Sequence, residues 1–145
     1  MTTFKLSSNY LLTGMIAIAL LLTISSCAKK AVFQTSSVVP AARGSIKVKK
    51  DNNNNHVITV DVLDLAEPDR LQPPMKSYVV WMVTDENSTK NLGQIETSKK
   101  FLSKSLKGSF KTVSSFKPVR IFITAENEAT VQYPGMYVVL TTNNF

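Results

Sequence analysis

Residues 57–63 read VITVDVL, and this stretch carries the clearest sign of the fold. Apolar residues at the even positions alternate with Thr59 and Asp61, so a strand here would have one buried face and one solvent-exposed face. Residues 45–49, SIKVK, alternate in the same way, and the polar run DNNNN at 51–55 is typical of a hairpin tip. We therefore expect these two strands to pair.

Further along the chain, short β-branched and aromatic runs recur about every ten residues between turn residues, which is the pattern of an antiparallel β protein. The run SYVVWMVT at 77–84 is apolar on both faces. We expect it to be a central strand, with Trp81 packed between two sheets. The other strands are expected at 92–97, 109–114, 119–124 and 136–142. The stretch 98–106 is the one place where a helical turn could sit.

About seven short strands in about 100 residues predict an all-β domain over residues 44–145, an antiparallel two-sheet sandwich of immunoglobulin-like type. A small barrel is the alternative. The chain has a single cysteine, Cys27, so the cysteine pair of antibody domains is absent and the likeness is one of architecture.

Residues 1–26 have the layout of an export signal. Lys5 supplies a positive start, and residues 10–23 supply an apolar run that ends just before Cys27. The run is too short for a spanning helix, which needs roughly 20 apolar residues. We therefore expect residues 1–26 to be removed on export.

The tetrapeptide Ile24-Ser25-Ser26-Cys27 resembles the lipobox of bacterial lipoproteins, whose invariant Cys takes diacylglycerol before cleavage. The resemblance implies a cell-envelope protein anchored through acylated Cys27. Two or three acyl chains hold a protein at a membrane almost permanently, since each buried methylene contributes about 0.8 kcal/mol. Ala28, in place of Asp, implies the outer membrane by the sorting rule of some such bacteria. The alternatives are a buried helix that ends in a free Cys, and plain secretory cleavage.

Residues 28–43, AKKAVFQTSSVVPAAR, show no sustained period, and Ser, Pro and Ala dominate their second half. We expect residues 27–43 to form a lipidated tether. Extended, it would reach at most about 50 Å and lift the domain off the lipid headgroups.

The chain carries 17 Lys and Arg against 10 Asp and Glu, a net charge of +7. This moderate excess favours anionic partners but is far below the density of a nucleic-acid binder, and export also argues against nucleic acid. The segment from Lys99 to Lys117 contains Lys99, Lys100, Lys104, Lys107, Lys111 and Lys117, with no acidic residue between Glu96 and Glu126. Its first four lysines are candidate contacts to lipid headgroups or an anionic envelope polymer. The alternative is a sheet edge protected by lysine against aggregation.

The segment 67–76, EPDRLQPPMK, holds three of the six prolines, which favour an extended crossover over a central strand. Loops on a rigid scaffold commonly carry binding residues. Arg70 and Leu71 are therefore candidate contacts to an envelope protein, although a crossover alone would also explain the composition.

His56 is the only histidine, and it follows the Asn run at the start of a strand, where an exposed hairpin residue is the favoured interpretation. No Gly-x-Ser-x-Gly motif is present. Asp51, Asn53 and Asn55 match the opening of a calcium loop, but His56 and Val62 replace its Gly and Glu, which favours a solvated turn. We expect no catalytic residue, cofactor or metal; a hydrolase that uses His56 is the alternative.

Over roughly residues 45–142 the spacing resembles the extracytoplasmic C-terminal domain of anti-sigma-K-type regulators. The matching residues are Tyr78, Trp81, Leu92-Gly93, Thr124-Ala125-Glu126 and Pro134-Gly135. The resemblance implies a sandwich fold alone, because the chain has neither their sigma-binding segment nor their spanning helix. We therefore expect a lipid-anchored envelope protein that acts as a non-enzymatic binding or structural module.

Overall fold

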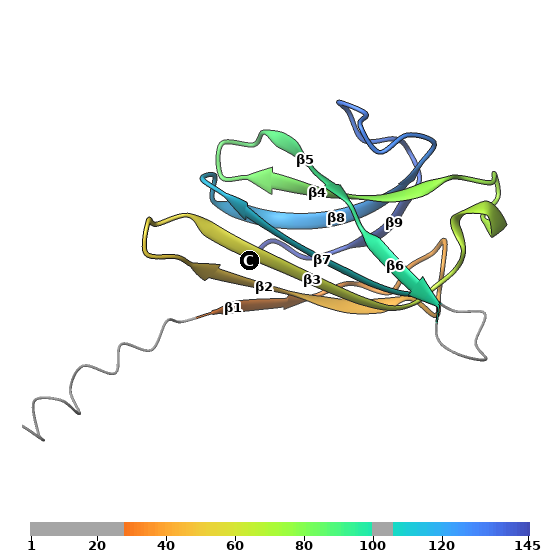
Figure 1. The fold of residues 1–145 in the computed structure, drawn as a ribbon, viewed down its shortest axis with the longest axis horizontal. Helices are drawn as coiled ribbons and strands as arrows, with labels where there is room; N and C mark the ends of the chain where they lie inside the picture. The colour runs from red at the N-terminus through yellow and green to blue at the C-terminus, as the bar shows by residue number, and fades with distance from the viewer. Residues whose placement is uncertain (1–27, 100–105) are drawn as a thin grey trace, which may run out of the picture.

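The computed structural model describes residues 28–99 and 106–145, which form two antiparallel sheets facing one another (Figure 1). The strand order is β1-β2-β3-β7-β6 in the five-stranded sheet and β5-β4-β8-β9 in the four-stranded sheet. The elements are β1 (Lys29–Val32), β2 (Arg43–Lys50), β3 (His56–Leu65), the short 3-10 helix η1 (Pro68–Arg70), β4 (Ser77–Thr84), β5 (Thr89–Gln94), β6 (Glu96–Lys99), β7 (Leu106–Ser114), β8 (Pro118–Glu126) and β9 (Val138–Thr141). The expected all-β class with two antiparallel sheets is confirmed. The described residues form nine strands, where about seven were expected. Both sheets are open, unlike a closed barrel.

The expected first hairpin is confirmed. β2 pairs with β3 in antiparallel register from Arg43↔Leu63 to Lys50↔His56. The even-numbered apolar side chains of β3 are buried and Asp61 is exposed, because alternate residues of a strand face the same side. The hairpin thus sets one wall of the core.

The core lies between the two sheets and draws on both. The five-stranded sheet contributes Ile46, Val48, Ile58, Val60 and Val62, and the four-stranded sheet contributes Tyr78, Val80, Met82, Ile121 and Ile123. As expected, β4 is an internal strand, since it pairs with β5 on one side and β8 on the other. Within the described residues, no helix has the length and apolar character needed to cross a membrane.

Trp81 is fully buried, but it does not lie between the sheets. Its neighbours along β4 point into the shared core, so Trp81 points to the outer face of the four-stranded sheet. There it packs with Val79 and Phe122 in a second apolar cluster, against which Ala129 and Val131 rest. The expected position between the sheets is wrong because a loop, and not the other sheet, covers the second apolar face of β4.

The segment 28–43 does not form the expected free tether. β1 pairs with β2 from Lys29↔Val48 to Val32↔Ser45. Phe33 forms a bridge to Thr142 near the other end of the chain, and its side chain is only 7% exposed. An edge strand of four residues is too short to show a period, which explains the error. Residues 1–26 and Cys27 lie outside the described residues, and the described fold begins at Lys29.

The strand expected at 92–97 is two strands in different sheets. β5 belongs to the four-stranded sheet and β6 to the five-stranded sheet, and the chain crosses between them at buried Ile95. Gly93 has a φ of 128°, a conformation that glycine adopts readily. The helical turn considered for 98–106 is absent from the part of that stretch that is described, since its two ends belong to β6 and β7.

Candidate functional site

The antiparallel strands place loops at two opposite ends of the domain (Figure 1). One end holds the start of β1, the hairpin tip at 51–55 and the turn at 115–117. The other end holds the 66–76 crossover and a long loop at 127–137 between β8 and β9, which we call the strap. The two ends differ sharply in chemistry.

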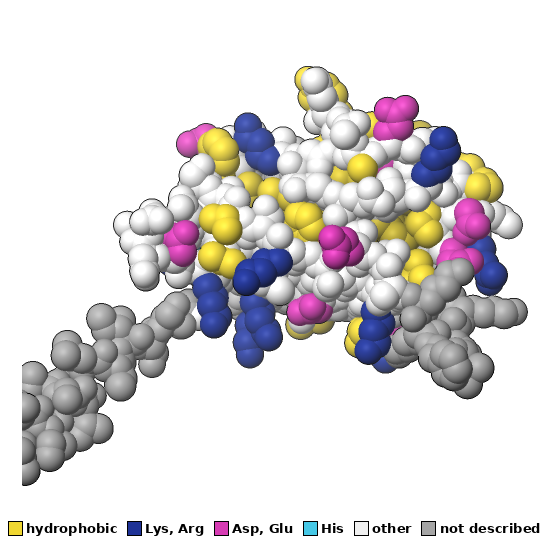
Figure 2. Space-filling view, in the orientation of Figure 1, with side chains coloured by type: hydrophobic (Ala, Val, Ile, Leu, Met, Phe, Trp, Pro, Cys, Tyr) yellow, Lys and Arg dark blue, Asp and Glu magenta, His cyan; other side chains and the backbone are white. Residues whose placement is uncertain are grey.

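The end where β1 begins carries a lysine-rich pocket of about 330 Å³. Its lining residues are Lys29, Val48, Lys49, Lys50, His56, Lys117, Pro118 and Phe145. Strand pairing brings these lysines together from three distant parts of the chain, at the start of β1, the end of β2 and the turn before β8. Figure 2 shows Lys and Arg side chains gathered over the five-stranded sheet at this end, which we call the basic end.

Few acidic groups oppose these lysines. Lys117 Nζ lies 3.8 Å from a carboxylate oxygen of Asp85, an exposed pair at the margin of the pocket. The carboxylate of Asp51 accepts the backbone N–H groups of Asn53 and Asn55, both at 2.8 Å. Desolvation raises the pKa of Asp51, but these hydrogen bonds and nearby His56 outweigh it and lower the pKa overall.

The carboxylate of Asp51 therefore closes the hairpin tip, as a turn and not as a cation loop. No group of three His, Cys, Asp or Glu side chains placed to hold a metal occurs in the described part of the chain. The Nδ1 atom of His56 is buried and has no hydrogen-bond partner. A triad histidine has a carboxylate on this nitrogen that orients the ring, and His56 lacks one.

At the other end, buried hydrogen bonds hold the strap against the outer face of the four-stranded sheet. Trp81 Nε1 donates to Thr124 Oγ1 at 2.7 Å. The hydroxyl of Thr124 donates to Glu126 Oε1 at 2.6 Å, and the same oxygen accepts the backbone N–H of Gly135 at 2.7 Å. The carboxylate of Glu126 thus ties the middle of the strap to the sheet.

A second attachment comes from β5. Asn91 Nδ2 donates to the carbonyl oxygens of Ala129 and Val131, at 3.0 and 2.8 Å. Both residues also pack on the Trp81 cluster. The strap is therefore fixed by polar and apolar contacts along its length.

The fixed strap presents large apolar side chains to solvent. Tyr133 is 81% exposed and Met136 is 91% exposed, and Val138 just after them is 40% exposed. We call these three residues the apolar tip. Figure 2 shows apolar side chains on the loop that projects beyond the four-stranded sheet, away from the basic end.

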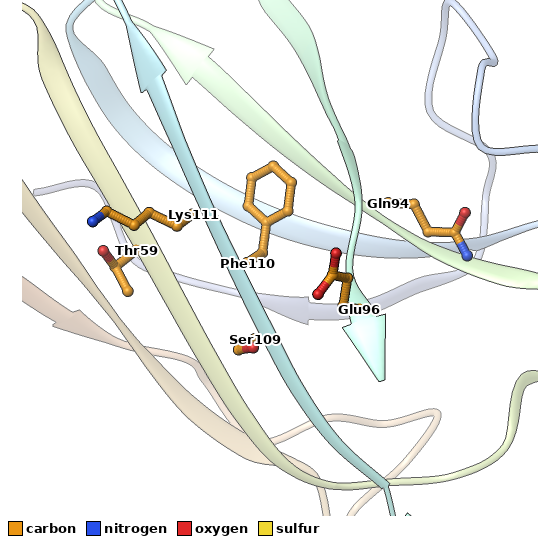
Figure 3. A pocket seen from close by; sticks show the side chains of 6 residues that line it. All are labelled: Thr59, Gln94, Glu96, Ser109, Phe110 and Lys111. Carbon is orange, nitrogen blue, oxygen red and sulfur yellow. The ribbon is translucent and has the colours of Figure 1, made fainter. Parts of the chain in front are cut away.

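A shallow groove of about 370 Å³ lies beside the point where the chain crosses from β5 to β6. It is lined by Thr59, Gln94, Glu96, Ser109, Phe110 and Lys111 (Figure 3). Figure 3 shows the Phe110 ring between β7 and the crossing chain, with the Lys111 side chain pointing toward β3. The lining offers hydroxyls, one acid and one base without a histidine or cysteine, which suits weak polar contacts better than nucleophilic chemistry.

The structure separates the residues of the two other predicted contact sites. Arg70 is exposed and its Nε pairs with Glu67 Oε2 at 3.0 Å, but Leu71 is buried in the main core. Strand β7 is about 26 Å long from its first to its last residue. Lys107 is exposed near its start, whereas Lys117 lies beyond its far end. Lys99 ends β6, and Lys100, Lys104 and Cys27 lie outside the described residues. The described lysines of the segment 99–117 do not form one patch.

No family model, curated protein or solved structure matches the chain. The resemblances to the lipobox and to the C-terminal domain of anti-sigma-K-type regulators therefore stay predictions. Four residues behind the second resemblance do share one structural role here, because Trp81, Thr124, Glu126 and Gly135 form the hydrogen-bonded chain under the strap.

Proposed function

We propose that the protein is a lipid-anchored cell-envelope protein, held at the outer membrane through acylated Cys27, whose domain is a non-enzymatic binding or structural module. The observation that carries the binding role is the apolar tip. Tyr133 and Met136 are 81% and 91% exposed on a strap that partly buried hydrogen bonds hold in place. Exposed apolar side chains on a fixed loop are typical of contact sites.

The energetics of the apolar tip suit a protein partner. Full burial of a large apolar side chain contributes about 1.5–3 kcal/mol, so Tyr133 and Met136 together could contribute about 3–6 kcal/mol. Little of this is lost to ordering, because the strap is already held by Glu126 and Asn91. The partner we propose is an envelope protein with an apolar pocket.

We further propose that the sandwich is of immunoglobulin-like type. The strand order supports this: β2, β3, β7 and β6 take the places of strands A, B, E and D, and β5, β4, β8 and β9 take those of C′, C, F and G. β1 is then an addition at the edge of strand A. The connection through Ile95, which switches sheets between β5 and β6, fits the step from C′ to D.

The anchor is tested by labelling cells with an alkyne fatty acid. The wild-type protein should incorporate the label and stay with the membrane fraction, whereas Cys27→Ser should lose both. Label retained in the mutant would contradict acylation at this residue.

The apolar tip is tested by a photo-cross-linking amino acid at position 133 or 136, with position 53 on the exposed hairpin tip as the matched control. Positions 133 and 136 should give a cross-linked species of defined mass in intact cells, and position 53 should not. The double variant Tyr133→Ser/Met136→Ser should fold normally, because both side chains are exposed, and should lose the partner. Equal cross-linking at all three positions would contradict a contact at the tip.

A further inference from the structure

The start of β1 limits how far the domain can lie from its proposed anchor. Lys29 already pairs with Val48, and only Ala28 separates it from Cys27. Two residues span at most about 7 Å even when extended. If Cys27 is acylated, the surface around Lys29 must therefore lie at the lipid headgroups.

That surface is the basic end, and its pocket has the chemistry of a phosphate site. Lys29, Lys49, Lys50 and Lys117 line one opening of about 330 Å³, and an ammonium group carries three donors. His56 also lines the pocket, and its Nδ1 is buried without a hydrogen-bond partner. Three apolar residues complete the lining and could rest against the glycerol and upper acyl region of a lipid.

The gathered lysines repel one another in the free protein. On the outer face beside the pocket, Lys30 stands directly opposite Lys47 across β1 and β2, an arrangement that destabilises a sheet. The acidic groups at this end are Asp51, which closes the hairpin tip, Asp85, which lies 3.8 Å from Lys117, and exposed Glu86 beside it. A bound anion would relieve the repulsion.

We propose that the pocket of the basic end binds the phosphate of an anionic phospholipid headgroup and so holds the domain upright on its membrane. The inference rests on the proposed function only in that Cys27 supplies the membrane. In this orientation the strap projects from the four-stranded sheet, on the side of the domain away from the five-stranded sheet, and leaves the apolar tip open to the proposed protein partner (Figure 1, Figure 2).

The test uses residues 28–145 without the acyl chains, so that binding by the pocket is measured apart from the anchor. Every described strand lies between Lys29 and Thr141, so this form contains the whole described fold. Its binding is measured to vesicles of phosphatidylglycerol mixed with phosphatidylcholine, and to vesicles of phosphatidylcholine alone. The wild-type domain should bind the first and not the second.

The pocket variant is Lys29→Gln/Lys50→Gln, and the matched control is Lys76→Gln/Lys107→Gln at the opposite end, which removes the same charge. All four lysines are exposed, so both variants should fold. Each lysine near an anionic surface contributes about a fivefold change in binding, so the pocket variant should bind about 25-fold more weakly. The control should bind like the wild type. An equal loss in both variants would show attraction by net charge alone and overturn the proposal.

Two further arms identify the ligand. His56 is the only histidine, so its ring resonances should shift when short-chain phosphatidylglycerol enters the pocket. Inorganic phosphate at matched ionic strength should not displace the vesicles; displacement together with the same His56 shift would assign the pocket to free phosphate and overturn the lipid assignment. If the domain does not bind the anionic vesicles although Cys27 is labelled in cells, this inference is refuted and the proposed anchor stands.

Discussion

Replacing Thr124 by valine removes the hydroxyl group that links Trp81 to Glu126. Valine has nearly the same shape as threonine, so the packing around position 124 is preserved. The indole N–H of Trp81, in a side chain that is 0% exposed, would lose its acceptor at 2.7 Å. Glu126 would lose a donor at 2.6 Å and keep the N–H of Gly135.

The expected cost follows from these two losses. A buried donor left unpaired costs about 1–3 kcal/mol, and a hydrogen bond to a charged group contributes about 1.5–3 kcal/mol. Thr124→Val should therefore lower the free energy of unfolding by about 3–5 kcal/mol, against the 5–15 kcal/mol typical of a whole domain. At roughly 4 °C per kcal/mol for a domain of this size, Tm should fall by about 12–20 °C.

The assay is thermal and denaturant unfolding followed by far-UV circular dichroism, a signal that does not depend on Trp81, the only tryptophan. The control is the double variant Trp81→Phe/Thr124→Val, which removes both partners of the bond and should cost less than the sum of the two single changes. A Thr124→Val protein that melts within about two degrees of the wild type would refute the buried hydrogen-bonded chain beneath the strap.

Three other variants test separate parts of the fold. Burial raises the pKa of Tyr78 to about 12, so the folded state keeps a proton that the unfolded chain loses near pH 10, and stability should fall as the pH rises through that interval. In denaturant titrations at several pH values, Tyr78→Phe should show a weaker alkaline loss, and an unchanged loss would contradict the role of Tyr78. Asn91→Ala removes two donors to the strap, so limited proteolysis should cut within 127–137 faster than in the wild type; equal rates would mean that other contacts suffice. Gly44→Ala would drive its methyl group into the carbonyl oxygen of Asp61 on β3, so its Tm should drop by several degrees, and a wild-type Tm would show that β2 can shift without cost.

The hairpin of β2 and β3 was predictable because strict alternation fixes which side chains face the core, and a polar tip fixes the register. The burial of Trp81 was predictable for a similar reason, since a run that is apolar on both faces must be covered on both. What covers the outer face was not predictable, because the strap has no regular period and is held by Glu126 at its start and by Asn91 of β5, 40 residues before Val131.

At the basic end, too, only part of the arrangement could be predicted from the sequence. Alternation and the hairpin place Lys50 opposite His56, and this pairing could be predicted from the sequence. Lys29 and Lys117 join them only through the pairing of β1 with β2 and the meeting of the two sheets, which are contacts between distant parts of the chain. The segment 99–117 is dense in lysine along the chain, but its described lysines do not form one patch, because density along a chain says little about density on a surface.

The meeting of the two ends of the chain has a consequence for how the protein comes to be folded. The backbone N–H of Gln34 donates to the carbonyl oxygen of Thr141 at 2.8 Å, and its side-chain amide donates to Asn143, 109 residues away, at 2.6 Å. Contacts this distant in sequence form late, because a long loop must close first. In a chain delivered amino end first through a narrow channel, β1 could pair with β2 early, but Gln34 would lack its partners until residues 141–143 had emerged. The fold would therefore be completed only after residues 141–143 had left the channel.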